Sequence, residues 1–250
     1  MSKKVALCLS GGVGLNHTAA LNINQLYSSR KYIDYVKCYN SIKKYIIQAN
    51  NTYEFDTFCH CWNMDLEEEL SALYSPRRKL FEDNRIYNDE ISNLCKESSH
   101  FSGISKTLSQ KKSIEIKEAY ELENNIQYDI VIIYRYDVLL WKPIILDTYT
   151  ALENTIYPTG GADGNSDFHF IMSNAASAQF KNLYESLSLG NRYLAHSWIK
   201  NYIIKYLKLK VVPDSILPGR HQEAMRKVPQ YSINKGYLSM NDFNTLFTDL

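Results

Sequence analysis

The feature of this sequence that most constrains its fold is a run of β-branched residues near the middle of the chain. Residues 130–133 read Ile-Val-Ile-Ile and directly follow Tyr128 and Asp129. A short, continuously apolar run of this kind is typical of a strand buried on both faces, as in a parallel sheet. Residues 105–125 precede it and place apolar side chains at helical spacing between lysines and glutamates. A helix that leads into a central strand predicts βαβ units and an α/β fold.

The rest of the chain alternates between short apolar runs and amphipathic stretches. Further strands are expected at residues 5–10, 55–62, 78–81, 156–157, 167–172 and 210–212. Further helices are expected at residues 31–49, 65–74, 174–188 and 192–207, and the tail from Asp214 is expected to be irregular. We predict a single α/β domain over residues 1–250, with a Rossmann-like, mostly parallel central sheet flanked by helices. Residues 1 to about 140 would form its nucleotide-binding half, and residues from about 141 to 250 the opposite wall of a cleft.

The charge of the chain gives little attraction to nucleic acids or acidic membranes. It has 28 Lys and Arg against 27 Asp and Glu, a net charge of +1. We therefore expect no nucleic-acid partner. No run reaches the ~18 apolar residues that a membrane span requires. The helix expected around Ile199, Tyr202 and Ile203 allows a peripheral membrane contact, although core packing is the more usual use of such a face.

The cysteines predict neither a disulfide framework nor a zinc site. They are an odd number without repeated spacing, namely Cys8, Cys38, Cys59, Cys61 and Cys95. We expect strand alternation to send the thiols of Cys59 and Cys61 to opposite faces, which would exclude a zinc site there. The N-terminal apolar run stops at Gly11 and Gly12, short of the ~7–15 apolar residues of a secretory signal. A reduced, cytoplasmic location is the simplest interpretation.

A glycine-containing loop follows the first expected strand. It reads Ser10-Gly11-Gly12-Val13-Gly14 and continues to Thr18. Glycines there let backbone N–H groups approach a phosphate or a base closely. The loop is not a P-loop, because no Lys precedes Thr18, and G-x-G-x-x-G does not fit either. We favour a ligand-facing loop, since parallel α/β sheets bind ligands at the carboxyl ends of their strands; a tight turn between strand and helix is the alternative.

A charged pair ends the most hydrophobic strand. Alternation puts Arg135 and Asp137 on the same face, where the strand emerges from the sheet. A carboxylate there could hold Mg²⁺ or Mn²⁺ bridging a diphosphate, and the guanidinium could bind phosphate. A purely structural ion pair at the strand end is the alternative.

Candidate acids, bases and further histidines lie elsewhere in the chain. Asp163 and Asp167 flank a glycine-containing loop that leads into a strand, which suits a general base or the recognition of sugar hydroxyls; surface-turn polarity would also explain them. His60 ends an expected strand and could face the cleft. His221 lies on a late loop and could reach a metal or a phosphate.

Taken in order, these segments resemble a known family. The order is a strand with Ser-Gly-Gly, then Asp56-x-Phe-x-His-x-Trp-Asn63, then Ser109-Gln-Lys-Lys-Ser113, then Tyr128-Asp-Ile-Val running into Arg135-x-Asp137, then Asp167-Phe-x-Phe170. It resembles the GT-A-type glycosyltransferases encoded in bacterial capsule and lipopolysaccharide loci and in giant viruses. The resemblance covers roughly residues 4–212.

The resemblance implies a glycosyltransferase of polysaccharide biosynthesis in the cytoplasm, or the host cytoplasm for a virus. It implies a nucleotide-sugar donor, a saccharide or glycan acceptor, transfer of a hexose or pentose, and a divalent metal, Mn²⁺ or Mg²⁺. In that family an Asp-x-Asp at the end of a central strand holds the metal and the donor diphosphate. Here the first Asp is replaced by Arg135. Either Asp137 is the sole carboxylate ligand, with His221 as a second ligand, or Arg135 neutralises the diphosphate directly.

The same resemblance assigns the remaining roles. Asp167 is expected to be the base that deprotonates the acceptor hydroxyl in an inverting reaction, with Asp163 as the second choice. The residues expected to contact the nucleotide or its phosphates are Ser10, Gly11, Gly12, His60, Lys111, Lys112 and Arg135.

Two other functions stay open from the sequence alone. One is an NTP-binding phosphotransferase that uses residues 11–18, which lack the P-loop lysine. The other is a non-catalytic saccharide-binding module that keeps the fold without the metal pair.

Overall fold

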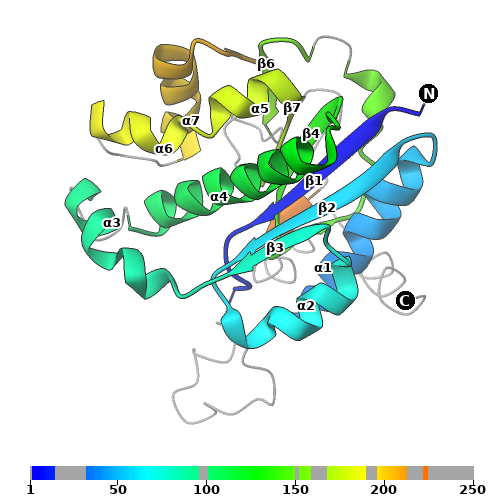
Figure 1. Cartoon of the computed structure of the whole chain (residues 1–250), viewed down its shortest axis with the longest axis horizontal. Coiled ribbons are helices and arrows are strands. Elements are labelled where there is room, and N and C mark those ends of the chain that lie inside the picture. The colour runs from blue at the N-terminus through cyan, green and yellow to red at the C-terminus, as the bar shows by residue number, and fades with distance from the viewer. Residues whose placement is uncertain are drawn as a thin grey trace, which may run out of the picture.

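In the described part of the chain, seven strands form one sheet through the middle of the molecule (Figure 1). The computed structural model describes residues 2–14, 32–95, 101–149, 152–158, 168–189, 196–212 and 222–224. In spatial order the strands are β3 (Arg78–Phe81), β2 (Glu54–Cys61), β1 (Lys4–Ser10), β4 (Ile130–Arg135), β7 (His169–Ser173), β6 (Thr155–Pro158) and β8 (Lys210–Val211). Strands β1 to β4 run parallel, β7 runs antiparallel to both its neighbours, and β8 is parallel to β6. The predicted α/β fold with a mostly parallel sheet is confirmed.

Each face of the sheet carries its own apolar core, because successive strand residues point to opposite faces. Val5, Leu7 and Leu9 pack with α1 (Tyr35–Ile42) and α2 (Glu67–Tyr74). Ala6 and Cys8 pack on the other face. The helices of that face are α3 (Asn88–Leu94), α4 (Phe101–Asn124), α5 (Asn174–Phe180), α6 (Leu183–Ser186) and α7 (His196–Tyr202). Figure 1 shows the long α4 lying over the sheet, where it contacts β1, β2 and β3.

The expectation that Cys59 and Cys61 point to opposite faces is wrong. Residues two apart in a strand share a face, and both thiols lie in the core with α1 and α2. All five cysteines are free thiols. Burial raises the pKa of Cys59 and of Cys61 to about 12, so both are protonated at neutral pH.

Short 3-10 and π segments extend or connect the main helices. They are η2 (Lys43–Ile47), η3 (Gln48–Asn50), η4 (Met64–Leu66), η5 (Asn84–Tyr87), η7 (Leu146–Thr148), η8 (Leu187–Leu189) and η9 (Ile203–Leu207). Ile199, Tyr202 and Ile203 are buried in the core under α4. None of the helices in the described ranges is long and apolar enough to cross a bilayer.

A second, two-stranded sheet lies beyond the end of β4. It pairs β5 (Val138–Leu140) with β9 (Gln222–Ala224) in antiparallel register, Val138 opposite Ala224. The expectation of an irregular tail from Asp214 is therefore wrong at residues 222–224. This pairing brings a late segment of the chain beside the strand that starts immediately after Asp137.

The strand order reverses between β1 and β4. From β1 the sheet grows toward β2 and β3 on one side, while β4 and the later strands lie on the other. Ligands of doubly wound α/β proteins bind outside the carboxyl ends of strands at such a switch point. The carboxyl ends of β1 and β4 are thus the place to look for a site.

Candidate functional site at the carboxyl ends of β1 and β4

The switch point brings the glycine turn and Arg135 together. Ser10 and Arg135 are direct partners across the parallel strands β1 and β4. The Ser10 side chain is buried, and its Oγ has no hydrogen-bond partner in the described part of the chain. Gly11 has a φ of +98°, and a Cβ added to it would meet no described atom within 4 Å. A ligand could therefore approach the main chain of Gly11 closely.

Gly12 fits closely beside the end of β2. A Cβ at Gly12 would lie 3.1 Å from Oδ1 of Asn63, tighter than an ordinary contact. The same Oδ1 accepts a hydrogen bond from the Val13 N–H at 2.8 Å, and the Gly11 carbonyl accepts one from the Trp62 N–H at 3.2 Å. The turn after β1 is therefore tied to the two residues that follow β2.

Arg135 and Asp137 form a two-point ion pair. The Arg135 Nε lies 2.8 Å from Oδ1 of Asp137, and Nη2 lies 2.6 Å from Oδ2. The exposed fraction is 18% for the Arg135 side chain and 7% for that of Asp137. The guanidinium also lies over the Phe168 ring, 5.5 Å from its centroid. The shared face predicted from alternation is confirmed, and the ion pair that the sequence left as an alternative is present.

Both oxygens of Asp137 are turned toward Arg135, and little of its side chain is exposed. A Cβ on Gly14 would lie only 3.7 Å from its Oδ2, and Gly14 is held in turn by the Ile33 N–H at 2.9 Å. The carboxylate that the sequence offers as a metal ligand is thus paired with an arginine, and Gly14 lies beside its Oδ2. Arg135, the more exposed partner, is the member of the pair that a ligand can reach.

Lys106 is a second cation of this region, and sequence reasoning did not identify it. It lies on α4, one turn before Ser109, whose hydroxyl contacts the Gly11 N–H. Burial and the nearby positive charge of Arg135 lower its pKa to about 7, and Asp137 opposes this only in part. At neutral pH Lys106 is therefore only partly protonated, and an anion bound beside it would raise its pKa and favour its charged form.

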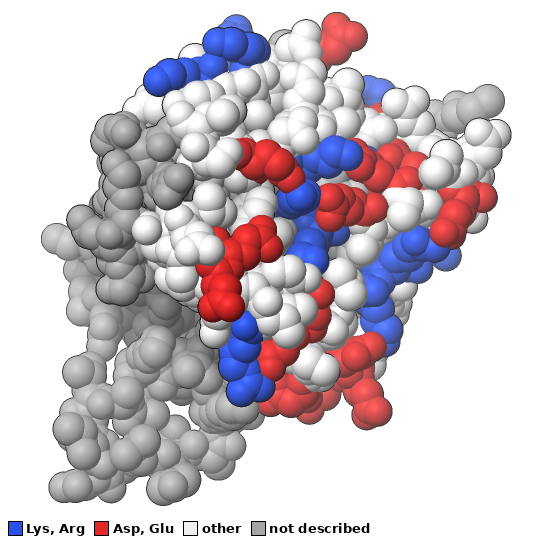
Figure 2. All heavy atoms as spheres, turned by 60° about the vertical axis from the view of Figure 1, so that its left-hand side comes forward, with Lys and Arg blue, Asp and Glu red and all other residues white. Residues whose placement is uncertain are grey.

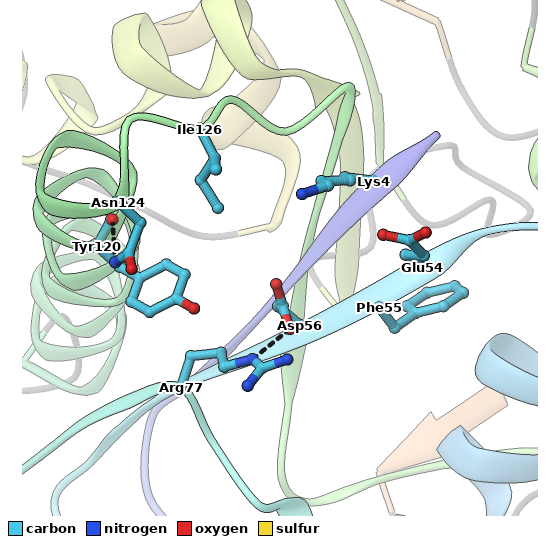
Figure 3. A pocket seen from close by; sticks show the side chains of 8 residues that line it. All are labelled: Lys4, Glu54, Phe55, Asp56, Arg77, Tyr120, Asn124 and Ile126. Carbon is cyan, nitrogen blue, oxygen red and sulfur yellow. Dashed lines mark hydrogen bonds and ion pairs between the residues drawn. The ribbon is translucent and has the colours of Figure 1, made fainter. Parts of the chain in front are cut away.

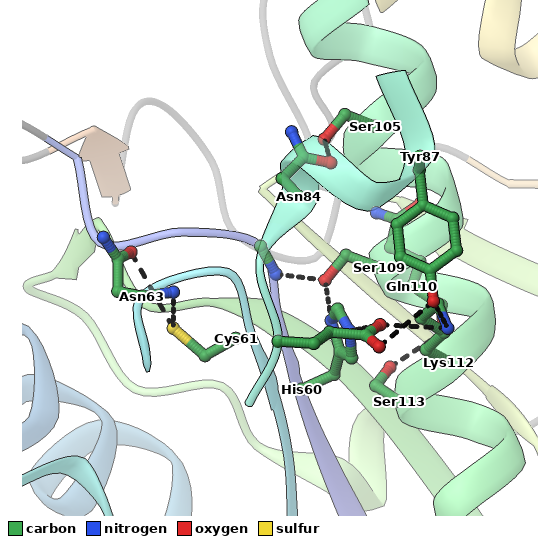
Figure 4. Close-up of polar contacts among 12 residues, drawn as sticks. His60, Cys61, Asn63, Asn84, Tyr87, Ser105, Ser109, Gln110, Lys112 and Ser113 are labelled. Atoms are coloured by element: carbon green, nitrogen blue, oxygen red, sulfur yellow. Dashed lines mark hydrogen bonds and ion pairs between the residues drawn. The ribbon is translucent and has the colours of Figure 1, made fainter. Parts of the chain in front are cut away.

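His60 is enclosed behind the glycine turn (Figure 4). Its Nδ1 lies 2.6 Å from Oγ of Ser109, and its Nε2 lies 3.0 Å from Oε1 of Glu82. The imidazole ring packs edge-on against the Trp62 ring, with 4.4 Å between the two ring centroids. Burial lowers the pKa of His60, and Lys112 adds to this against the opposing effect of Glu82. A fully buried ring with both nitrogens in contact leaves no atom for direct contact with a donor.

Lys112 and Lys111 make contacts away from the glycine turn. Lys112 Nζ lies 2.9 Å from Oε1 of Glu82 and donates to the Tyr87 hydroxyl at 2.7 Å. Lys111 pairs with Glu185 and lies over the Tyr184 ring. Both lysines therefore have protein partners, and their expected contact with ribose or phosphate would require these pairs to open.

The other predicted site residues are not described. Asp163, Asp167 and His221 all lie outside the described ranges. Phe168, which follows Asp167 in the chain, is described and stacks on Arg135. Because β7 runs antiparallel to β4, with His169 opposite Tyr134, the start of β7 lies at the carboxyl end of β4.

The described residues do not form a metal site by themselves. Across the described ranges, no three His, Cys, Asp or Glu side chains gather closely enough to hold an ion. Asp137 has both oxygens on Arg135. No chemical step is therefore assigned to a metal, and the pair of Asp137 and His221 as metal ligands stays a prediction.

A separate hollow of about 520 Å³ lies at the opposite edge of the sheet (Figure 3). It is lined by Lys4, Glu54, Phe55, Asp56, Arg77, Tyr120, Asn124 and Ile126. Lys4 and Glu54 begin β1 and β2, so this is the amino edge. Asp56 is held there by the Arg77 Nε at 2.5 Å and by the Tyr128 hydroxyl at 2.7 Å. None of the predicted site residues lines this hollow.

Charged side chains of both signs are interspersed on the face of the molecule seen in Figure 2. Acidic and basic groups lie next to one another among the described residues of this view. The described residues of this face therefore form no large patch of a single sign.

Comparison with known proteins finds similarity at the level of structure. No family model and no curated protein matches the chain. A solved structure of a proposed nucleotide-diphospho-sugar transferase from Desulfovibrio desulfuricans G20 is similar, with a TM-score of 0.46 and 12% sequence identity. The match covers 98% of this chain and 94% of that one. A likeness of this degree does not identify an activity, so function has to be argued from the site.

Proposed function

We propose that this chain is a glycosyltransferase that binds the diphosphate of a nucleotide-sugar donor at the carboxyl ends of β1 and β4. The observation that carries the proposal is the register of Ser10 with Arg135. It places a glycine turn, with space beside Gly11, next to Arg135, the more exposed member of its ion pair. A guanidinium is a usual partner of phosphate oxygens, and the missing Cβ of Gly11 lets a ligand approach the main chain closely.

The chemistry follows from where charge develops during transfer. As the sugar leaves a diphosphate, negative charge grows on the leaving group. Arg135 is oriented by Asp137 and by the Phe168 ring, so its guanidinium is held in place before the donor arrives. Lys106 lies near it, and negative charge on the leaving group would favour the protonated form of this lysine. A guanidinium fixed in this way stabilises the leaving diphosphate without reorganisation.

The acceptor side of the proposal is a saccharide whose hydroxyl Asp167 deprotonates, with Asp163 as the second candidate. It is supported by the position of Asp167 in the chain, directly before the Phe168 that stacks on Arg135. A role in cytoplasmic polysaccharide biosynthesis, of the capsule, lipopolysaccharide or viral kind, rests on the resemblance of the motif order.

Calorimetric titration with UDP- and GDP-sugars and with ATP and GTP tests the donor site. We expect a nucleotide sugar to bind more tightly than the triphosphates and Lys106→Gln to weaken its binding ~10-fold, since each 1.4 kcal/mol is tenfold. The matched control is Lys205→Gln, which removes a lysine from η9. Tighter binding of a triphosphate would instead support the phosphotransferase.

Transfer and donor hydrolysis should then be measured in EDTA and with added Mn²⁺. We expect donor binding to survive chelation, because Arg135 and Lys106 supply the positive charge. A Mn²⁺-dependent gain that His221→Ala removes would instead support the metal pair of Asp137 and His221. Binding of saccharides with neither transfer nor hydrolysis would leave the non-catalytic module as the function.

A further inference from the structure

A buried chain of hydrogen bonds connects the glycine turn to the surface of α4. The Gly11 N–H donates to Oγ of Ser109 at 2.5 Å. Ser109 is 2.6 Å from Nδ1 of His60, whose Nε2 is 3.0 Å from Glu82. The side chains of His60 and Ser109 have no exposed surface.

The direction of each bond in this chain is fixed by the carboxylate at its end. Burial opposes ionisation of Glu82, but hydrogen bonds from His60 and Lys112 outweigh it and hold its pKa at about 2. An ionised carboxylate only accepts, so Nε2 of His60 carries the proton. A neutral imidazole then accepts at Nδ1, and the one proton of Ser109 points there. The lone pairs of Ser109 are left for the Gly11 N–H.

Glu82, at the outer end of this chain of hydrogen bonds, has two further partners. Glu82 accepts from Lys112 at 2.9 Å and from the Tyr87 hydroxyl at 3.1 Å. Lys112 lies over the Tyr87 ring, 4.6 Å from its centroid. Lys112 is therefore linked to the glycine turn indirectly, through its contact with Glu82 and the contact of Glu82 with His60.

We propose that His60 and Ser109 are positioning residues that set the Gly11 peptide for donor binding, which rests on the function proposed above. Ser109 holds the Gly11 N–H while the Trp62 N–H holds the Gly11 carbonyl at 3.2 Å. Glycine loses more conformational freedom on folding than any other residue. Fixing its peptide in advance removes that cost from the binding step and raises affinity.

Two substitutions of His60 separate the loss of its hydrogen bond with Ser109 from the general effect of losing the imidazole ring. In His60→Asn the side-chain oxygen takes the place of Nδ1 and can accept from Ser109, while the contact with Glu82 is lost. In His60→Gln the amide nitrogen takes the place of Nε2 and keeps Glu82, while the acceptor for Ser109 is lost. We expect donor affinity to survive in His60→Asn and to fall in His60→Gln, although both lose the imidazole.

Ser109→Ala tests the other member, with Ser113→Ala as its control. Ser113 is equally buried on the same helix, but its hydroxyl bonds to the Gln110 carbonyl within α4. We expect Ser109→Ala to speed hydrogen exchange of the Gly11 amide and to weaken donor binding, each ~10-fold, as loss of one hydrogen bond implies. Ser109→Thr keeps the hydroxyl and should restore both.

Equal exchange and affinity in Ser109→Ala and Ser113→Ala would overturn the inference, as would equal affinity in the two His60 variants. The two proposals fail separately. If the wild-type protein binds no nucleotide sugar, the donor site is wrong and the positioning of a donor falls with it. If the wild-type protein binds but the variants bind equally well, only the positioning role is wrong.

Discussion

Arg135 holds both carboxylate oxygens of Asp137, at 2.8 and 2.6 Å, while the turn at Gly14 covers the carboxylate from the other side. Removing one partner of a buried ion pair leaves an uncompensated charge. We therefore expect Arg135→Met to lower the free energy of unfolding by about 3–5 kcal/mol. The double variant Arg135→Met/Asp137→Asn should be more stable than Arg135→Met alone. Urea denaturation of the wild type and the two variants measures these free energies of unfolding. A loss below ~1 kcal/mol in Arg135→Met, the value of a surface ion pair, would contradict the burial of Asp137.

Gly11→Ala should destabilise the protein through its backbone alone. The φ of +98° is one that a residue with a Cβ rarely adopts, and space beside it removes any steric contribution. We expect a loss of about 1–2 kcal/mol. Gly14→Ala is the control, because its Cβ would meet ordinary contacts at 3.7 Å or more and its φ is not positive. Equal losses in the two variants would argue against the left-handed turn.

Acid should destabilise the protein partly through Glu82 and His60. The folded pKa of Glu82 is about 2 against an ordinary 4.5, so its contribution is present above pH 4.5 and is lost as the pH falls toward 2. Burial lowers the pKa of His60 below 6.5, so the unfolded chain takes up that proton first and stability also falls below pH 6.5. Melting temperatures from pH 8 to 3 should fall less steeply in Glu82→Gln than in the wild type.

Glu115→Gln is the control for that series. Glu115 is 46% exposed, and its distance from Lys111 is 3.7 Å. Its removal should leave the pH dependence unchanged. A Glu82→Gln curve parallel to that of the wild type would mean that Glu82 has an ordinary pKa.

Asp167→Asn should separate chemistry from binding. If Asp167 is the general base, transfer should fall ~10²–10⁴-fold while the Kd for the donor stays the same. Single-turnover transfer and donor titration on the same preparation measure the two effects. A loss of donor affinity would make Asp167 a donor ligand, and normal transfer would move the role to Asp163, tested by Asp163→Asn.

The main elements could be predicted because their signals are local. The apolar run of β4 and the helical spacing of α4 each lie within a single segment. The alternation of strands with helices along the chain then predicts that the strands pair in parallel. β9 escaped prediction because Gln222–Ala224 is short and its partner β5 lies far away in the sequence. No local pattern encodes a pairing of that kind.

The residues of the candidate site were harder to predict than the fold. Alternation correctly placed Arg135 beside Asp137, but it could not show that the turn at Gly14 covers the carboxylate. Lys106 was missed because lysines on an amphipathic helix usually face solvent. One signal was available for Ser109: it stands four residues from both Ser105 and Ser113, a polar stripe along a helix face, and all three are buried.

The pairing of β5 with β9 has a consequence for synthesis of the protein. The strand that leaves Asp137, Val138–Leu140, gains its hydrogen-bonded neighbour only when Gln222–Ala224 has been translated. On the ribosome, β1, β2, β3, β4 and α4 can assemble earlier, since β1 contacts β2, β4 and α4, and β2 contacts β3. Residues 141–221 must also leave the ribosome before β5 can pair with β9. Formation of this small sheet is therefore a late event in co-translational folding.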